Sequence, residues 1–264
     1  MTQASASLPS DRFAVGDFRI GKVFSRAWSV FSRNFVTFMV VIGVANLPSL
    51  FIPQPALGTP ASPTADLSVT FFVALFLSIV LSTLGQAMVL YGAFQDMRGR
   101  PVSLADCFKV GLRRFFPIIA LAIIMMVALG FSAILLIFPA VMLAMMWFVA
   151  TPVCVVEQLG PFRSMGRSRV LTKGHRWKLF GLVLLILIPA IIVGAIMGVT
   201  VLTLGASGFL ALNAVLASSL GKLFGLVWKA AWGAFLAVVI AMTYHDLRVA
   251  KEGLTTEQIA SVFE

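Results

Sequence analysis

Charged residues are scarce in this chain of 264 residues, and their scarcity excludes most classes of soluble protein. Aspartate, glutamate, lysine and arginine make up 11% of the residues, against about a quarter in ordinary soluble domains, and hydrophobic residues make up 60%. The mean hydropathy is +1.01. So little polar surface cannot coat a globule in water, which excludes a soluble enzyme, a disordered chain and a nucleic-acid-binding domain. The composition therefore predicts an all-α, polytopic membrane protein.

Cysteine and histidine are also rare, with two residues of each. Cys107 and Cys154 are too few for a disulfide framework, so we expect free thiols in a reducing compartment. His175 and His245 could ligate a metal with a neighbouring carboxylate, but histidine beside arginine at the membrane surface is the simpler interpretation. The sequence holds no HExxH pair, no GxSxG serine and no glycine-rich phosphate loop. We therefore expect no catalytic residue, no metal and no cofactor, and we interpret the protein as a non-enzyme.

Six apolar stretches approach or exceed the roughly 20 residues that cross a bilayer as a helix. They lie at 35–52, 69–94, 117–138, 139–156, 179–204 and 223–244. Spans three and four are separated only by a tight turn at 137–140, and 205–221 is interpreted as a re-entrant or surface helix. The predicted domains are a cytoplasmic segment at 1–34, a six-span membrane domain at 35–244 and a cytoplasmic tail at 245–264.

Lysine and arginine are unevenly distributed around these spans, and this predicts their orientation. Of 20 such residues, 18 lie in the N-terminal segment, the connections after spans two and four, and the C-terminal tail. With six spans, all of these segments lie on one side of the membrane, which predicts that both termini are cytoplasmic. Five or seven spans would scatter the same charges over both sides.

Three basic stretches, at 23–35, 104–116 and 162–180, lead directly into spans one, three and five. The first two place aromatic and aliphatic residues at helical spacing on one face, as amphipathic helices at a membrane interface do. Ser103 is the expected N-cap of the second helix, with Asp106 three residues later. The pattern of a basic helix followed by a hairpin of spans occurs three times. It indicates either a weak threefold repeat or the composition that any interfacial helix needs.

Several short motifs resemble one family of bacterial membrane proteins. The motifs are the run WSVFSRNF at 28–35, the tract RGRPVS at 98–103, and above all PVCVVEQLGP at 152–161 with SMGRSRVLTKGHRW at 164–177. They are similar to the six-span proteins related to the membrane domain of glycerophosphodiester phosphodiesterases. The resemblance implies a stand-alone membrane domain of the bacterial inner membrane, without the phosphodiesterase barrel. It implies an architecture and not a reaction.

The connection between spans four and five is the expected recognition segment, because it holds six cations within sixteen residues. Arginine suits bidentate contact with phosphate oxygens, and tryptophan anchors at the headgroup level. We expect Arg167, Arg169 and Arg176, with Trp177, to contact anionic lipid headgroups or an acidic partner surface. Glu157 is expected to orient one of these arginines through an ion pair. The alternative is a topology signal on a solvated helix face.

Three polar side chains inside the predicted spans are further candidates. Asn46 and Gln86 either line a small polar pocket or form hydrogen bonds between helices. Lys229 lies between Trp228 and Trp232, so it either extends to the outer interface or faces a substrate.

The function that fits these features best is a non-catalytic, lipid-associated scaffold or accessory subunit. The alternative is a transporter or channel subunit for a small or lipidic substrate. The expected partners are membrane lipids, with a membrane protein or a second copy of the chain, and not nucleic acid.

Overall fold

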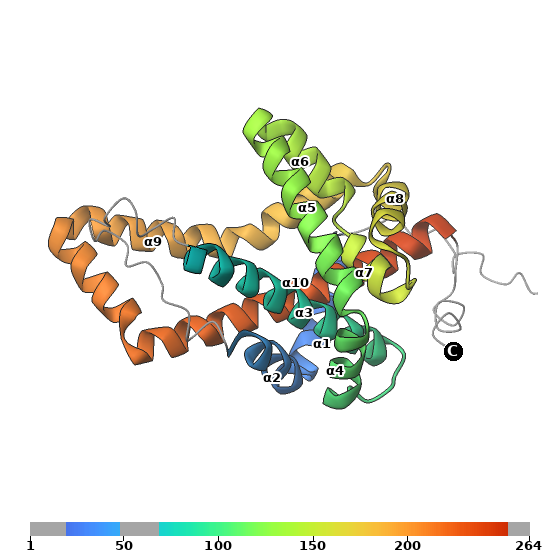
Figure 1. Ribbon diagram of the computed structural model, residues 1–264, viewed down its shortest axis with the longest axis horizontal. Helices are drawn as coiled ribbons and strands as arrows, with labels where there is room; N and C mark the ends of the chain where they lie inside the picture. Colours follow the sequence, from blue (N-terminus) through green and yellow to red (C-terminus); the bar gives the residue numbers. More distant parts are fainter. Residues whose placement is uncertain (1–19, 48–68, 253–264) are drawn as a thin grey trace, which may run out of the picture.

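The computed structural model is all-helical, and it describes residues 20–47 and 69–252. Ten helices account for nearly all of the described residues, without a strand among them (Figure 1). The helices are α1 (Ile20–Arg33), α2 (Phe35–Asn46), α3 (Val69–Met97), α4 (Leu104–Arg113), α5 (Phe115–Leu135), α6 (Ile137–Met146), α7 (Ala150–Val156), α8 (Pro161–Thr172), α9 (Arg176–Ala217) and α10 (Ser219–Glu252). Predictions for 1–19, 48–68 and 253–264 lie outside the described residues.

Five stretches within these helices are long and apolar enough to cross a membrane. They are Phe76–Met97, Phe115–Leu135, Phe138–Val156, Arg176–Ile196 and Ser219–Glu252. A sixth is reached only if α1 and α2, which meet at 82°, are counted as one bent span. The 12 residues of α2 are too few to cross alone, and the rest of the first predicted span, 48–52, is not described. The set of long apolar helices fits a membrane-spanning protein.

The turn between the third and fourth predicted spans lies slightly earlier than expected. Leu136 alone is extended, with φ −163° and ψ 137°, and α6 begins at Ile137. Pro139 thereby falls in the first turn of α6, where its missing N–H group is not needed. The break must precede the proline by a few residues, which explains the difference. The helices α5 and α6 form a hairpin that projects from the other helices (Figure 1).

The fourth predicted span is interrupted at 147–149, where the sequence suggested one continuous helix. The interruption frees the backbone carbonyl of Met146 from the usual helical pattern. Two hydroxyl groups of α8 bind this carbonyl: Ser168 Oγ donates to it at 2.8 Å and Thr172 Oγ1 at 3.3 Å. A broken helix within a membrane is tolerated when neighbouring side chains satisfy the freed backbone groups in this way. Ser168 and Thr172 are therefore buried for a structural reason.

The three predicted basic helices correspond to α1, α4 and α8, and each is separated from the next helix by a short break. Asn34, Arg114 and His175 at these breaks share one backbone conformation, with φ between −116° and −103° and ψ between 7° and 21°. This region of φ/ψ space is typical of turns. The third basic helix is shorter than expected, because Gly174, with φ +90°, ends it and α9 starts at Arg176. Ser103 caps α4, as predicted, by accepting from the backbone N–H of Asp106.

The last two helices are longer than their predicted spans. Helix α9 continues past a non-helical residue, Gly205, so most of the stretch at 205–221 is helical. Ser218 ends α9, and its side-chain oxygen accepts from the backbone N–H of Gly221 at the start of α10. Helix α10 then runs through Glu252, although 245–252 were expected in a tail. The end of α9 and the start of α10 extend away from the other helices (Figure 1).

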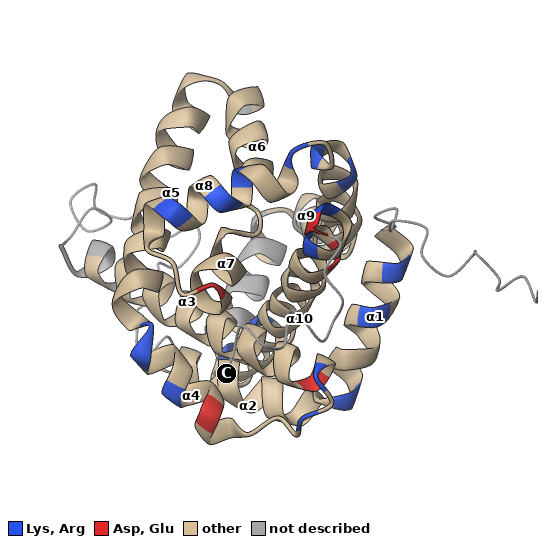
Figure 2. Cartoon of the chain, turned by 90° about the vertical axis from the view of Figure 1, so that its right-hand side faces the viewer, with Lys and Arg blue, Asp and Glu red and all other residues tan. Residues whose placement is uncertain are grey.

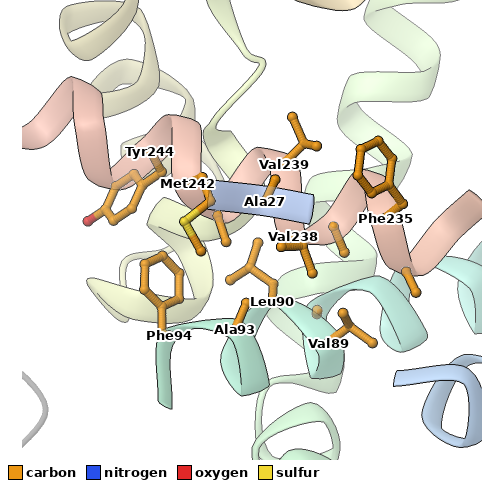
Figure 3. Close-up of a cluster of buried hydrophobic side chains, with 14 of the residues drawn as sticks. Ala27, Val89, Leu90, Ala93, Phe94, Phe235, Val238, Val239, Met242 and Tyr244 are labelled. Carbon is orange, nitrogen blue, oxygen red and sulfur yellow. The ribbon is translucent and has the colours of Figure 1, made fainter. Parts of the chain in front are cut away.

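The core forms where α10 packs against α1, α2 and α3. Small residues, among them Ala27, Ala93 and Ala237, are fully buried there and allow the helix backbones to approach closely. Larger side chains fill the space between them, and the rings of Phe94 and Tyr244 meet edge to face at 5.7 Å (Figure 3). Helix α10 is thus the central helix of the structure.

Large apolar side chains cover the outer surfaces of α5, α6 and α9. Ile134 is 84% exposed, and Phe131, Phe138, Ile191 and Ile196 are also exposed. A soluble monomer rarely exposes so large a continuous apolar surface. Lipid acyl chains are a suitable surrounding for these side chains.

Close packing at Gly92 predicts a strong effect of added volume. A Cβ atom at this position would lie 2.9 Å from the ring of Phe38 and 3.1 Å from Val102. Gly92→Leu should therefore destabilise the protein by about 1–3 kcal/mol. Gly130→Ala is the control: nothing lies within 4 Å of that position, and alanine favours a helix over glycine by about 1 kcal/mol. Unfolding of the purified protein in detergent measures both, and equal stability of the two variants would contradict this packing.

Candidate functional site

Charged residues gather at one end of the structure, on α1, α4 and α8 (Figure 2). Ion pairs connect the helices there. Arg26 of α1 donates to Asp246 of α10 at 3.2 Å. Arg33, at the end of α1, pairs with Asp96 of α3, and Asn34 Nδ2 donates to the same carboxylate at 2.8 Å. Asp96 therefore holds the sharp bend between α1 and α2 in place.

Five side chains from α8, α10 and the end of α7 form a closed ring, here called the Tyr244 ring. Glu157 accepts from Arg167 Nε at 3.1 Å and from the Tyr244 hydroxyl at 2.8 Å. Arg167 also donates to Glu252. Arg248 closes the ring by donating to Glu252 at 2.8 Å and to the Tyr244 oxygen at 3.3 Å. Two carboxylates and two guanidinium groups make the ring electrically neutral.

The Tyr244 ring is mostly shielded from solvent on one side and more open at Arg167. The Arg248 and Glu157 side chains are 8% and 13% exposed, whereas those of Glu252 and Arg167 are 20% and 31% exposed. Charges in such surroundings are stable only when partners replace the lost hydration, and every ring member has two partners in the ring. The ring joins the turn after α7 to the last three turns of α10.

The expected ion pair of Glu157 is present, and its partner is Arg167. The sequence reasoning missed Tyr244, Arg248 and Glu252, which complete the ring. Their spacing of four residues places them on one face of a helix, and this was the available signal. The predicted sixth span ends at Tyr244, so Arg248 and Glu252 fall in the predicted tail.

The three arginines of the expected recognition segment have different surroundings. Arg167 is held by Glu157 and Glu252 within the ring. Arg169 lies two positions further along α8, on another side of that helix, and is exposed. Arg176 is the first residue of α9, and its buried Nε has no hydrogen-bond partner among the described residues.

Arg176 and Trp177 border an apolar groove between α6 and α9. The groove has a volume of about 350 Å³ and is lined by Phe138, Val141, Met142, Met145, Arg176, Trp177 and Phe180. Arg176 is the charged member of this otherwise apolar set. Trp177 is 73% exposed, and its ring meets that of Phe180 edge to face at 6.2 Å. A cation therefore stands at the edge of a surface suited to a hydrocarbon chain.

The structure does not bring the three intramembrane candidates into one pocket. Asn46 is buried and donates to the carbonyl of Ile42 in its own helix at 2.9 Å. Gln86 donates to Ser82 Oγ, also within one helix, at 3.4 Å. Lys229 reaches a different helix, where its Nζ donates to Ser78 Oγ of α3 at 3.3 Å.

Trp228 and Trp232, on either side of Lys229 in the sequence, stack at 6.1 Å with an angle of 12° between the rings. Both line an apolar groove of about 420 Å³ between α1, α9 and α10. This end of α10 is therefore aromatic and apolar around a lysine that is bound to α3.

No cluster of three or more histidine, cysteine, aspartate or glutamate side chains suited to a metal occurs among residues 20–47 and 69–252. His245 Nδ1 lies 3.3 Å from Asp246, which also binds Arg26. Cys107 and Cys154 are free and buried. Burial is the main cause that raises the pKa of the Cys107 thiol to about 11, so this thiol is protonated at neutral pH.

No protein-family model, no curated protein and no solved structure matches this chain.

Two substitutions in the Tyr244 ring should destabilise the protein by different amounts. Tyr244→Phe removes two hydrogen bonds and should cost about 1–2 kcal/mol. Glu157→Ala also leaves Arg167 without one of its carboxylates, and should cost about 3 kcal/mol. Arg163→Ala is the control, because Arg163 is exposed on α8, where substitutions cost about 0.5 kcal/mol or less. Denaturation in detergent ranks the three variants, and a Tyr244→Phe variant as stable as Arg163→Ala would show that the ring does not stabilise the fold.

Proposed function

We propose that this chain is an integral protein of the bacterial inner membrane with six spans and cytoplasmic termini. The observation that carries the proposal is the one-sided distribution of lysine and arginine, of which 18 of 20 fall in four alternate segments. The spans are the segment beginning with α2, then α3, α5, α6 with α7, α9 and α10. Helices α1, α4 and α8 lie at the cytoplasmic interface. The resemblance to the membrane domain of glycerophosphodiester phosphodiesterases supports the same architecture.

Its role is that of a lipid-associated scaffold or accessory subunit without catalytic activity. The groove between α6 and α9 takes one acyl chain of an anionic phospholipid, and Arg176 binds the phosphate of the same lipid. This assignment is supported by the buried Nε of Arg176, which has no partner among the described residues, and by the apolar lining. Trp177 and Arg169 contact neighbouring headgroups. Arg167 has a structural role instead, because two carboxylates bind it.

A scaffold fits the polar groups of the spans better than a transporter does. Gln86 and Thr83 bond within α3, and Asn46 donates within α2, so these groups stabilise helices. Lys229 ties α10 to α3. A transporter usually has several charged groups near the midplane that face a substrate path.

Reporter fusions test the six-span topology. Fusions at residues 60, 137 and 210 should report the periplasm, and fusions at 105, 168 and 260 the cytoplasm, because alternate connections carry the cations. Paired reporters that are active on opposite sides of the membrane give each position two independent measurements. One reversed position would exclude this arrangement of spans.

Substitution of Arg176 by lysine tests lipid association separately from topology. Arg176→Lys keeps the positive charge but loses the planar pair of donors, so retention of phosphatidylglycerol should fall by about fivefold. Arg163→Lys, at an exposed position of α8, is the control and should match the wild type. Native mass spectrometry of the detergent-released protein counts the retained lipids. Equal retention in all three proteins would show that Arg176 contributes charge alone.

A further inference from the structure

A third, more polar cavity shares no lining residue with the groove of Arg176 or with the groove beside Trp228. It is formed where the end of α3, the end of α4 and the turn after α7 meet, and its volume is about 200 Å³. The lining residues are Tyr91, Gln95, Arg98, Arg100, Val110, Arg113, Arg114, Val155 and Gln158. Four of these nine are arginines, and no described lining residue is acidic.

The backbone fixes the arginines that follow α3. Gly99, with φ +68°, ends the helix in the left-handed conformation, which glycine adopts without strain. The backbone N–H of Arg100 then donates to the backbone carbonyl of Gln95 at 3.0 Å, and the backbone N–H of Gly99 donates to the backbone carbonyl of Asp96 at 3.0 Å. The turn is therefore anchored, and it places Arg98 and Arg100 at the cavity.

Another lining residue, Gln158, is held in an unusual backbone conformation. Gln158 has φ +55°, a value that costs a residue with a side chain about 1–2 kcal/mol. Glu157, the residue before Gln158, belongs to the Tyr244 ring. The backbone carbonyl of Gln158 accepts a hydrogen bond from the Arg114 side chain at 3.5 Å. The ring thus fixes the turn that forms this part of the cavity wall.

Polar groups without charge complete the cavity. Gln95 Nε2 donates to the hydroxyl oxygen of Tyr91, so the hydroxyl proton remains able to donate to a ligand. The side-chain oxygen of Gln95 is buried without a hydrogen-bond partner among the described residues. Such an oxygen is usually satisfied by a bound donor, either water or a ligand hydroxyl.

We propose that this cavity binds a phosphate-bearing anion. Arginines from the end of α3 and the end of α4 line one small cavity, and a phosphate group can accept charge-assisted hydrogen bonds from more than one of them at once. Phosphate oxygens match the paired donors of arginine better than a spherical anion does. The volume is below the 300–1,000 Å³ typical of sites for drug-sized ligands, so it suits one phosphate group rather than a large metabolite. The site is independent of the lipid groove and of the proposed scaffold role.

A cytoplasmic topology signal also needs basic residues, but it needs no particular geometry. Lys109 and Arg113 separate the two explanations, because both are exposed cations on α4 and only Arg113 lines the cavity. Lys109→Gln and Arg113→Gln remove the same charge from the same helix. A topology signal would treat the two substitutions alike, whereas a binding site would not.

The test uses the full chain in a maltoside detergent, which contains no phosphate. Inorganic phosphate is titrated against chloride at constant ionic strength, and binding is measured by isothermal titration calorimetry. Arg113→Gln should weaken binding by about tenfold or more, since it removes a charge-assisted hydrogen bond, and Lys109→Gln should bind as the wild type does. Melting without phosphate confirms that both variants are folded.

A second arm distinguishes free phosphate from a lipid headgroup. The same three proteins are mixed with phosphatidic acid, and bound lipid is counted by native mass spectrometry. Binding of inorganic phosphate that depends on Arg113 assigns the cavity to a soluble phosphate, and dependence on Arg113 with phosphatidic acid alone assigns it to a headgroup. The proposal is overturned if neither probe binds, or if Arg113→Gln and Lys109→Gln behave alike with both.

Discussion

The Tyr244 ring constrains the rest of the charged end because it joins segments that are far apart in the sequence. Glu157 and Tyr244 are 87 residues apart, and Arg167 and Glu252 are 85 apart. Between them run α9 and most of α10, and α10 packs against α1, α2 and α3. The buried charges can be matched in few arrangements, so the ring sets the position of α10 relative to α8. It also fixes the turn at Gln158, and through that turn one wall of the arginine cavity.

The long helices differ in what their surfaces face: some pack on other helices, and others turn large apolar side chains outward, where lipid suits them. The half of α10 near the ring is packed on α1, α2 and α3 through alanines, whereas α5, α6 and much of α9 turn large side chains outward. In a bilayer, association of helices depends on close packing and not on exclusion of water. The small residues of α10 and the close approach at Gly92 supply such packing, which is why the centre is compact while the outer helices stand apart.

Much of the fold could be predicted from hydropathy and charge, because both act locally. The apolar stretches, the basic helices α1, α4 and α8, and the cap at Ser103 follow from neighbouring residues. The interruption at 147–149 could not be predicted, since its residues are apolar and the hydroxyl groups that satisfy its freed carbonyl lie on α8. The continuation of α10 past Tyr244 was missed for a similar reason: polar residues near a chain end resemble a tail until their buried partners are known.

The candidate sites show the same division between local and distant information. Arg167 and Glu157 are ten residues apart, so their pairing could be anticipated from sequence. The cavity of arginines combines three segments, and its basic members were interpreted only as a topology signal. The groove beside Arg176 depends on how α6 lies against α9, which no local pattern contains.

The carbonyl of Met146 makes the interrupted helix depend on residues that come later in the chain. Its partners Ser168 and Thr172 lie 22 and 26 residues further on, so the hydrogen bonding of the break at 147–149 is complete only when α8 packs against α6. A substitution on α8 can therefore act on the backbone of α6, and the segment from α6 to α8 behaves as one structural unit.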